Sequence, residues 1–409
     1  MMRRTFLAAA TTAPAVLRAT TDKRGHTYAE VEKILAKGDV KGKLTRDDLP
    51  TPALMLDLDA FEFNIAKMAN YCKDHNRALR PHGKTHKCPE IAKALIREGA
   101  VGACAAKISE AEVFAANGVS GLLVTTAVIG KQKIERAVRL ASQRHDTIFC
   151  VDNAQNVRDL NDAAGVAHIK MNVAVDLFIA GRTGIQPGEP ALGLAQLIDS
   201  LPNLKLIGIQ AYAGHASHVI GWEERRKVSQ TAMARAVDTA RLFEKNGIEC
   251  PLLTGGSTGT YNIDSDIKGI TELQPGSFMF MDVDYSRIGG KDGGAVYRDF
   301  GTSLSVLTTV VSRPTDSLAI VDGGFKAFST DKPFTPEVRG IQGITYSWGG
   351  DEHGKLDLAK ASAPVNLGDR LEFVVPHCDP SVNLYDRLYC RRGDNVEAVW
   401  KIAARGMSQ

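Results

Sequence analysis

Between residues 51 and 290, short apolar runs alternate with longer segments of helical periodicity. The run ALMLDL has the character of a strand, and the segment after it places Phe61, Ile65, Met68 and Tyr71 on one helix face. This unit recurs about eight times, with strands expected at residues 53–58, 78–82, 101–106, 121–128, 146–152, 168–176, 204–212 and 251–256. Such a rhythm over about 240 residues is typical of a (β/α)8 barrel. An open doubly wound sheet is the alternative, but no GxGxxG follows the first strand.

The pattern changes after about residue 290. Short segments rich in β-branched residues then follow one another closely and are joined by Gly, Pro and Asp. They lie at 303–313, 317–324, 343–348, 370–377, 387–392 and 396–402. We therefore predict an α/β fold: a TIM-like barrel over residues 51–290, followed by a mostly β domain over 291–409. Residues 21–50 are polar and rich in Lys and Gly, and we expect them to form a lead-in segment that packs on the β domain.

Composition narrows the class of partner. The chain has 50 Lys and Arg against 47 Asp and Glu, a formal charge of +3, which is too small for a surface that coats nucleic acid. A small-molecule ligand is expected instead. The seven cysteines are scattered without a CxxC pair, so we expect reduced, mostly buried thiols and neither a disulfide framework nor a zinc cluster. No later segment approaches the roughly 18 uninterrupted apolar residues of a membrane span.

The first twenty residues, MMRRTFLAAATTAPAVLRAT, contain a twin arginine at Arg3 and Arg4 followed by a run of small apolar residues. Residues 1–20 resemble a short twin-arginine export signal. The alternative is an N-terminus that begins with a few basic residues and has no signal function. The protein is expected in the periplasm if the signal is used, and in the cytoplasm otherwise.

Residues 80–87 read RPHGKTHK, which gathers cations in a nearly neutral chain. If this stretch is a strand and its exit, period two places on one face Arg80, His82, Lys84 and His86. Barrel active sites lie at strand exits. Burial and the neighbouring cations would there lower the pKa of Lys84, as a Schiff-base lysine requires, whereas Lys87 lies past the run. The alternative is a solvated basic turn that binds nothing.

Two glycine-rich turns follow later strands of the expected barrel. LLTGGSTGTY (252–261) contains Thr258 among three glycines, and ELQPGSFMFMDVDY contains Gly276 and Ser277. Backbone N–H groups and hydroxyls in such turns bind phosphate, and late barrel strands commonly carry phosphate sites. Together with the lysine, the two turns favour pyridoxal phosphate (PLP) as a cofactor.

The stretch PHCDP (376–380) follows a strand-like run in the β domain. Period two places His377 and Asp379 on one face and Cys378 on the other. An imidazole and a carboxylate suit a divalent ion completed by water, with Mn, Mg or Co favoured over thiolate-bound Zn. A His-x-Asp pair is also common on protein surfaces, so this stretch alone does not establish a metal site.

Taken together, these stretches resemble the D-threonine aldolase and D-serine dehydratase-like family of fold-type III PLP enzymes, whose barrel resembles that of alanine racemase. The likeness runs from residue 51 to 406 and includes TPALMLDLDAFEFNI, RPHGKTHKCPEIA, TGGSTGTY, ELQPGSFMFMD and PHCDP. It implies an alanine racemase-like barrel at 51–290, a D-serine dehydratase-like domain at 291–409, and a homodimer.

Residue by residue, the resemblance implies that Lys84 is the catalytic Schiff-base lysine and that Lys87 is not. The residues that match cofactor-binding positions are Arg182, Tyr212, Thr258, Gly276, Ser277 and Tyr285. Arg182 matches an arginine near the phenolate oxygen of the cofactor, while Tyr212 is equally well explained by barrel packing. His377 and Asp379 match the metal pair.

The implied activity is cleavage of a D-threonine-like D-β-hydroxy-α-amino acid to glycine and an aldehyde, with PLP and a divalent metal. A dehydratase acting on D-serine or D-3-hydroxyaspartate is the main alternative. Dehydrating relatives tend to present a cysteine where this chain has Asp379, which favours the aldolase. A non-catalytic PLP-binding protein would have no use for a metal pair. A racemase would need a second base, for which the chain offers no convincing candidate.

Overall fold

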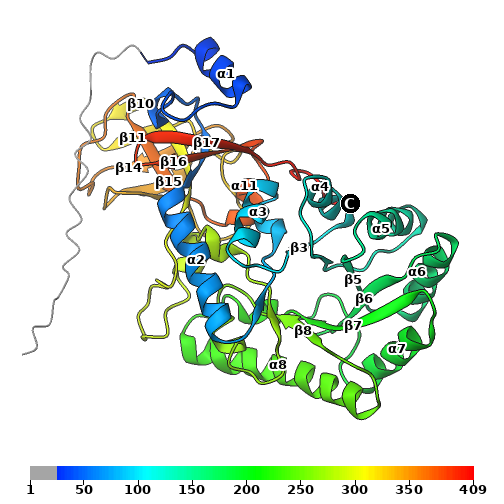
Figure 1. The fold of residues 1–409 in the computed structure, drawn as a ribbon. Helices are drawn as coiled ribbons and strands as arrows, with labels where there is room; N and C mark the ends of the chain where they lie inside the picture. The colour runs from blue at the N-terminus through cyan, green and yellow to red at the C-terminus, as the bar shows by residue number, and fades with distance from the viewer. Residues whose placement is uncertain (1–24) are drawn as a thin grey trace, which may run out of the picture.

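The computed structural model describes residues 25–409 and contains a barrel and a β domain (Figure 1). Within these residues the barrel sheet has eight parallel strands in the order β2-β9-β8-β7-β6-β5-β4-β3. Their bounds are β2 (Ala78–Leu79), β3 (Ala103–Ala105), β4 (Leu122–Val124), β5 (Ile148–Val151), β6 (Met171–Asp176), β7 (Leu204–Ala211), β8 (Leu252–Gly255) and β9 (Glu272–Leu273). His82 bridges Cys104 where the ends of the sheet meet. The predicted TIM-like fold class is confirmed.

Amphipathic helices cover the outside of this sheet. They are α2 (Leu58–Asp74), α3 (Pro89–Arg97), α4 (Ile108–Ala116), α5 (Lys131–Gln143), α6 (Ala154–Val166), α7 (Glu189–Ser200), α8 (Trp222–Lys245) and the short α9 (Tyr261–Asp264). In α5 the buried residues are Ile134, Ala137, Leu140 and Ala141, which is the three-to-four spacing of one helix face. The strands between them are buried on both faces, as parallel strands under helices are.

The second sheet belongs to the β domain and runs in the order β13-β14-β11-β10-β1-β16-β17, with β15 on β10 and β12 on β15. Its strands are β1 (Ala53–Asp57), β10 (Leu304–Thr315), β11 (Leu318–Val321), β12 (Glu337–Val338), β13 (Thr345–Trp348), β14 (Gly354–Asp357), β15 (Arg370–Val374), β16 (Arg387–Arg392) and β17 (Asn395–Lys401). Two further short helices are α10 (Val283–Ser286) and α11 (Cys378–Val382).

One predicted strand lies in the other sheet. The sequence assigned β1 to the barrel as its first strand, but β1 pairs with β10 and β16 of the β domain. The remaining barrel strand is β9, which is only two residues long and pairs with β2 and β8. An apolar run does not specify its sheet, and two residues are too few to show a period, so the pattern along the chain could not make this assignment.

The lead-in segment lies on the β domain. Helix α1 (Tyr28–Lys37) begins at Thr27, whose side chain accepts from Glu30 N in a capping box, and it is drawn above the β domain in Figure 1. Apolar residues of this segment, among them Val31 and Leu44, pack with Met55 of β1 in a small separate core. The candidate signal at residues 1–20 lies outside the residues that the structure describes.

The PHCDP stretch of the β domain is hydrogen-bonded to the segment that follows β9. Val283 N, after β9, donates to Val375 O at 3.1 Å. Asp282 Oδ2 accepts from Cys378 N at 2.9 Å. These bonds hold the PHCDP stretch against the segment that follows β9.

All seven cysteines are free and six are buried, as predicted. Among residues 25–409, no helix is both long enough and apolar enough to span a membrane.

Candidate active site at the barrel mouth

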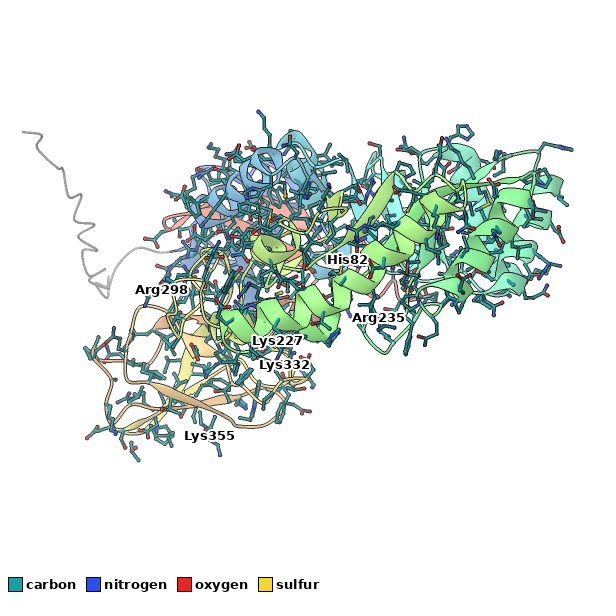
Figure 2. All side chains as sticks on the ribbon, turned by 90° about the horizontal axis from the view of Figure 1, so that it is seen from below. His82, Lys227, Arg235, Arg298, Lys332 and Lys355 are labelled. Atoms are coloured by element: carbon teal, nitrogen blue, oxygen red, sulfur yellow. The ribbon has the colours of Figure 1, made fainter. Side chains whose placement is uncertain are left out.

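The RPHGKTHK stretch leaves strand β2 at once. The strand ends at Leu79, and His82 then caps a short 3-10 helix, Gly83–Thr85, in which Lys84 N donates to His82 Nδ1 at 3.4 Å. The predicted strand alternation is therefore wrong. A Cβ at Gly83 would lie 2.4 Å from the Phe114 ring of helix α4. The turn can pass this close to α4 only because residue 83 is a glycine. In Figure 2 the labelled His82 lies near the middle of the molecule.

Lys84 faces the β domain. Its Nζ lies 3.7 Å from Asp379 Oδ1, and its side chain is 36% exposed. Burial lowers the pKa of Lys84, but the negative charge of Asp379, together with the smaller effects of Tyr212 and Cys378, raises the pKa above its ordinary value. The sequence predicted a lowered pKa, and that prediction is wrong for the site as it stands here, because the nearest charge is a carboxylate.

The cations expected around Lys84 are neutralised or uncharged. Arg80 donates to both oxygens of the buried Glu272, at 3.0 and 2.9 Å. Burial lowers the pKa of His86 to about 3 and holds that of His82 well below its ordinary value, so both imidazoles are neutral at pH 7. The sequence had suggested that Arg80, His82 and His86 surround Lys84 with positive charge. This prediction is wrong, because Arg80 is paired and both histidines are neutral.

Lys87 is engaged elsewhere. Its backbone lies in the left-handed region with φ of 49°, and its Nζ donates to Glu110 Oε1 at 3.0 Å. Glu110 belongs to helix α4 and is fully buried. The two lysines of the stretch thus have different partners, and Lys84 is the one that lies beside the PHCDP stretch.

The two glycine-rich turns meet beside Lys84. They follow β8 and β9, and β9 is flanked by β8 and β2, so three neighbouring strands carry all three predicted stretches. Thr258 Oγ1 accepts from Phe278 N at 2.9 Å, which ties the turn after β8 to the turn with Gly276 and Ser277. A Cβ at Gly276 would lie 2.5 Å from Thr85 Oγ1, so this turn also contacts the lysine segment.

The other predicted cofactor residues lie around the same point. Tyr212 raises the pKa of Lys84 and Arg182 lowers it. The Arg182 guanidinium carbon is 5.8 Å from the centre of the Tyr212 ring. Tyr285 is buried in α10, where its backbone N donates to Asp282 Oδ1 at 2.9 Å.

The predicted metal pair, His377 and Asp379, lies at the N-terminus of helix α11 and not in an extended strand as the sequence had suggested. Strand β15 ends at Val374, and His377 is the residue that precedes α11. His377 Nε2 lies 3.9 Å from Asp379 Oδ2, and its Nδ1 lies 2.7 Å from Asp331 Oδ2. Among the described residues, no group of three or more His, Cys, Asp or Glu is arranged to hold a metal. An ion on His377 and Asp379 would therefore need water to complete its ligands.

Comparison with known proteins adds a second line of evidence. Residues 56–284 match the family model "Alanine racemase, N-terminal domain", and residues 303–391 match "Putative serine dehydratase domain". A D-threonine aldolase of Arthrobacter sp. is 38% identical over 88% of this chain and 93% of its own length. A 3-hydroxy-D-aspartate aldolase of Paracoccus denitrificans (strain Pd 1222) is 37% identical over 89% of this chain and 94% of its own length.

The chain belongs to the D-threonine aldolase and D-serine dehydratase-like family. The solved structure of D-threonine aldolase from Filomicrobium marinum agrees, with a TM-score of 0.85 and 36% identity over 91% of this chain and 99% of that one. The family resemblance stated from the motifs is thus confirmed.

Asp284, His218 and Lys332 form a polar cluster beside Tyr285, and the sequence did not single out Asp284 or Lys332. Asp284 Oδ2 lies 3.1 Å from His218 Nδ1 and 2.7 Å from Lys332 Nζ, and the His218 ring packs on Tyr285 at 4.3 Å between centroids. Burial raises the pKa of Asp284, but these two partners outweigh it and leave the pKa well below the ordinary value. Lys332 comes from the β domain (Figure 2), and no spacing in the sequence links it to the barrel.

Asp331 was also missed. It accepts from His377 across 46 residues of sequence, and no motif marks it. By holding a proton on Nδ1, Asp331 leaves the Nε2 lone pair of His377 free on the side of Asp379. This is the usual arrangement behind a metal-binding histidine.

Proposed function

We propose that the protein is a PLP- and divalent-metal-dependent aldolase that cleaves a D-β-hydroxy-α-amino acid to glycine and an aldehyde. The observation that carries the proposal is the 3.7 Å approach of Lys84 Nζ to Asp379 Oδ1, which sets an amine beside an imidazole–carboxylate pair from the other domain. Two relatives named as aldolases, at 37% and 38% identity, support the reaction class.

The turns around Lys84 fit a phosphate. Within residues 25–409, the backbone N–H groups of Thr258, Gly259, Gly276 and Ser277 donate no hydrogen bond to another residue. A Cβ at Gly259 would lie 2.1 Å from Ser217 O, so only glycine allows this close approach. Four free donors in two adjoining turns are the arrangement that anions take in proteins.

The residues that would hold the cofactor follow from this placement. Thr258, Gly276, Ser277 and Tyr285 would surround the phosphate, Arg182 would face the ring oxygen, and Lys84 would be the point of covalent attachment. PLP, when bound, supplies an electron sink for the bond that breaks at the α-carbon of the amino acid.

The β-domain loop fits a hard or borderline divalent ion. His377 offers one imidazole nitrogen and Asp379 a carboxylate, while Cys378 Sγ is buried and donates to Asp379 Oδ2 at 3.4 Å. Without a thiolate ligand, Mn, Mg or Co suits the pair better than Zn. A bound ion would polarise the β-hydroxyl of the substrate.

The chain's own groups orient the lysine and its surroundings. His82, held neutral by burial, accepts from Lys84 N and so fixes the turn that carries the amine. Its Nε2 lies 3.4 Å from Thr125 Oγ1. Asp284, between His218 and Lys332, joins the barrel to the β domain at the same mouth and adds polar groups on the side next to Tyr285.

The reaction is tested by its products. Purified protein with PLP and Mn²⁺ is incubated with D-threonine, D-serine or D-3-hydroxyaspartate, and the products are identified as aldehyde with glycine, keto acid with ammonia, or the L-isomer. We expect glycine and an aldehyde, with Lys84→Ala as the inactive control. Keto acid and ammonia without glycine would replace the proposal by a dehydratase. Cofactor binding without any product would favour a non-catalytic PLP-binding protein.

The oligomeric state is part of the proposal. We expect a homodimer, as the family resemblance implies. Sedimentation of the full chain at several concentrations tests this, and a monomer at all of them would contradict it.

A further inference from the structure

Arg225 of helix α8 is a fully buried cation bound by carbonyl oxygens alone. Its Nε donates to Gly259 O at 2.8 Å and its Nη2 to Gly289 O at 2.8 Å. Its Nη1 donates to Val219 O at 2.8 Å and to Ile288 O at 2.6 Å. The side chain is 0% exposed, and its four hydrogen-bond acceptors among residues 25–409 are all backbone carbonyls.

A buried charge without an opposite charge is unfavourable. Carbonyl dipoles compensate part of the cost of removing a guanidinium from water, but a buried cation is normally paired with an anion. Burial lowers the pKa of Arg225, which has the same physical cause. Asp299 acts on this charge only from beyond 4.0 Å, so among residues 25–409 no negative group contacts the guanidinium.

Two of the three loops held by Arg225 belong to the phosphate site proposed above, and the third lies against one of them. Gly259 directly follows Thr258, Val219 follows Ser217, and Ile288 with Gly289 follows Tyr285. The loops also touch one another, because a Cβ at Gly259 would lie 2.1 Å from Ser217 O. Ser217 Oγ is buried and has no hydrogen-bond partner in the part of the chain that the structure describes.

Arg225 is also connected to the free N–H groups. Tyr297, whose ring centre lies 5.9 Å from the guanidinium carbon, donates from its hydroxyl to Thr258 O at 2.8 Å. Thr258 O belongs to the same peptide unit as the N–H of Gly259. A donor on that oxygen strengthens the N–H as a donor, since hydrogen bonds in series polarise one another.

We propose that Arg225 is a positioning residue for the cofactor phosphate: it joins three loops beside the phosphate site and supplies a buried positive charge that the phosphate neutralises. The inference rests on the proposed function, because the phosphate is that of PLP. Arg225 reaches the phosphate through the peptide groups of the turn and not by direct contact.

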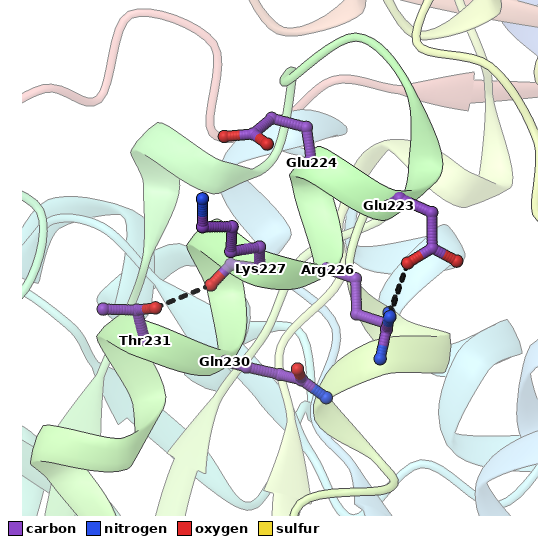
Figure 3. Close-up of a pocket in the computed structure, with 6 residues that line it drawn as sticks. All are labelled: Glu223, Glu224, Arg226, Lys227, Gln230 and Thr231. Carbon is purple, nitrogen blue, oxygen red and sulfur yellow. Dashed lines mark hydrogen bonds and ion pairs between the residues drawn. The ribbon is translucent and has the colours of Figure 1, made fainter.

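The neighbouring residue on the same helix is a matched control. Arg226 is 43% exposed and donates to Glu223 Oε2 at 3.0 Å. Figure 3 shows this pair in a hollow on α8, lined by Glu223, Glu224, Arg226, Lys227, Gln230 and Thr231. Arg226→Met therefore removes the same charge from the same helix, one residue away, without touching the loops.

The test compares two ligands that differ only in the phosphate. Full-length protein freed of cofactor is titrated with PLP and with pyridoxal, and binding is followed by visible absorbance for wild type, Arg225→Met and Arg226→Met. We expect Arg225→Met to weaken PLP binding by about 10-fold, about the net effect of one hydrogen bond, because the turn at Thr258 and Gly259 loses the donor that holds it in place. Pyridoxal binding should change less than about twofold. Arg226→Met should leave both unchanged.

Two outcomes would overturn the inference. One is a PLP affinity of Arg225→Met within about twofold of wild type. The other is an equal loss of PLP and pyridoxal binding, which indicates a structural role without any preference for phosphate. A wild type that binds no PLP would instead refute the proposed function.

A second pair of variants decides the case if Arg225→Met does not fold. Arg225→Lys keeps the charge and Arg225→Gln keeps hydrogen-bonding capacity without it. We expect the lysine variant to bind PLP at least about 5-fold more tightly than the glutamine variant, with similar thermal unfolding midpoints. Two results would overturn the role of the charge: equal PLP affinities of the lysine and glutamine variants, or a lysine variant that also fails to fold.

Discussion

The two sides of Lys84 are built from different groups. On the barrel side lie backbone N–H groups of the turns after β8 and β9, and the fully buried Arg225 donates to Gly259 O in the first of these turns. On the β-domain side, three charged or titratable side chains converge, and they are partly open to solvent: His377 is 21%, Asp379 19% and Asp331 42% exposed.

This difference indicates how firmly each side would hold its ligand, a phosphate on the barrel side and a metal ion on the β-domain side. Backbone donors in a buried turn have little freedom, so a phosphate bound on the barrel side would be fixed before the substrate arrives. Side chains open to water can exchange an ion and rearrange around a substrate hydroxyl. Substitutions on the barrel side should therefore change cofactor binding, whereas substitutions on the β-domain side should change metal dependence and leave the cofactor in place.

Lys84→Ala should have the largest effect, because this lysine lies between the two sides. We expect activity to fall by about 10²- to 10⁴-fold or more, together with loss of the visible absorbance of bound cofactor. Lys87→Ala is the control, since Lys87 Nζ is bound to Glu110 Oε1 at 3.0 Å. The assignment fails if Lys87→Ala loses the absorbance and Lys84→Ala keeps it.

Arg80→Met should lower the free energy of unfolding by about 3–5 kcal/mol, because it leaves the carboxylate of Glu272 buried and unpaired. A loss of stability would show that Arg80 stabilises the barrel and does not act on Lys84. Denaturant unfolding measures it. Adding Glu272→Gln to the variant should recover part of the loss, and a stable but inactive single variant would show that Arg80 acts in catalysis after all.

His377→Ala should retain the cofactor absorbance and lose the stimulation of activity by Mn²⁺, because only the β-domain side is changed. Titration with Mn²⁺ followed by electron paramagnetic resonance should show weaker binding by about 100-fold or more. Loss of the cofactor together with the metal would contradict the separation of the two sides.

Asp331→Asn should have a smaller effect on the same side. We expect Mn²⁺ to bind about 10- to 100-fold more weakly, since His377 loses the carboxylate that fixes its tautomer, and activity should return at high Mn²⁺ concentration. Asp351→Asn serves as control, because Asp351 is 70% exposed and lies 3.7 Å from Lys326. An unchanged Mn²⁺ affinity in Asp331→Asn would rule out the positioning role.

The sequence predicted the elements of the fold well and their partners less well. Periodicity located the helices and most strands, but β1 was placed in the wrong sheet because its apolar run suits either one. The motif residues were found because each belongs to a short local pattern. Lys84 and Asp379 come from different domains, and their 3.7 Å contact could be expected only through the family resemblance.

The charges around the lysine could not be predicted from its own segment. Arg80 is neutralised by Glu272, 192 positions further along the chain, and Asp331 contacts His377 across 46 positions. Arg225 lies in a helix whose pattern gives no sign of a role, because its partners are backbone carbonyls. Contacts of this kind depend on the tertiary structure, as does the contact with Asp379 that raises the pKa of Lys84.

The most direct test of the account is to identify the lysine that carries the cofactor. Holoprotein is reduced with borohydride, which fixes PLP to its lysine, then digested and mapped by mass spectrometry, with and without Mn²⁺. The account predicts the added mass on Lys84 alone in both conditions. Added mass on Lys87, or on a lysine outside the barrel mouth, would contradict it.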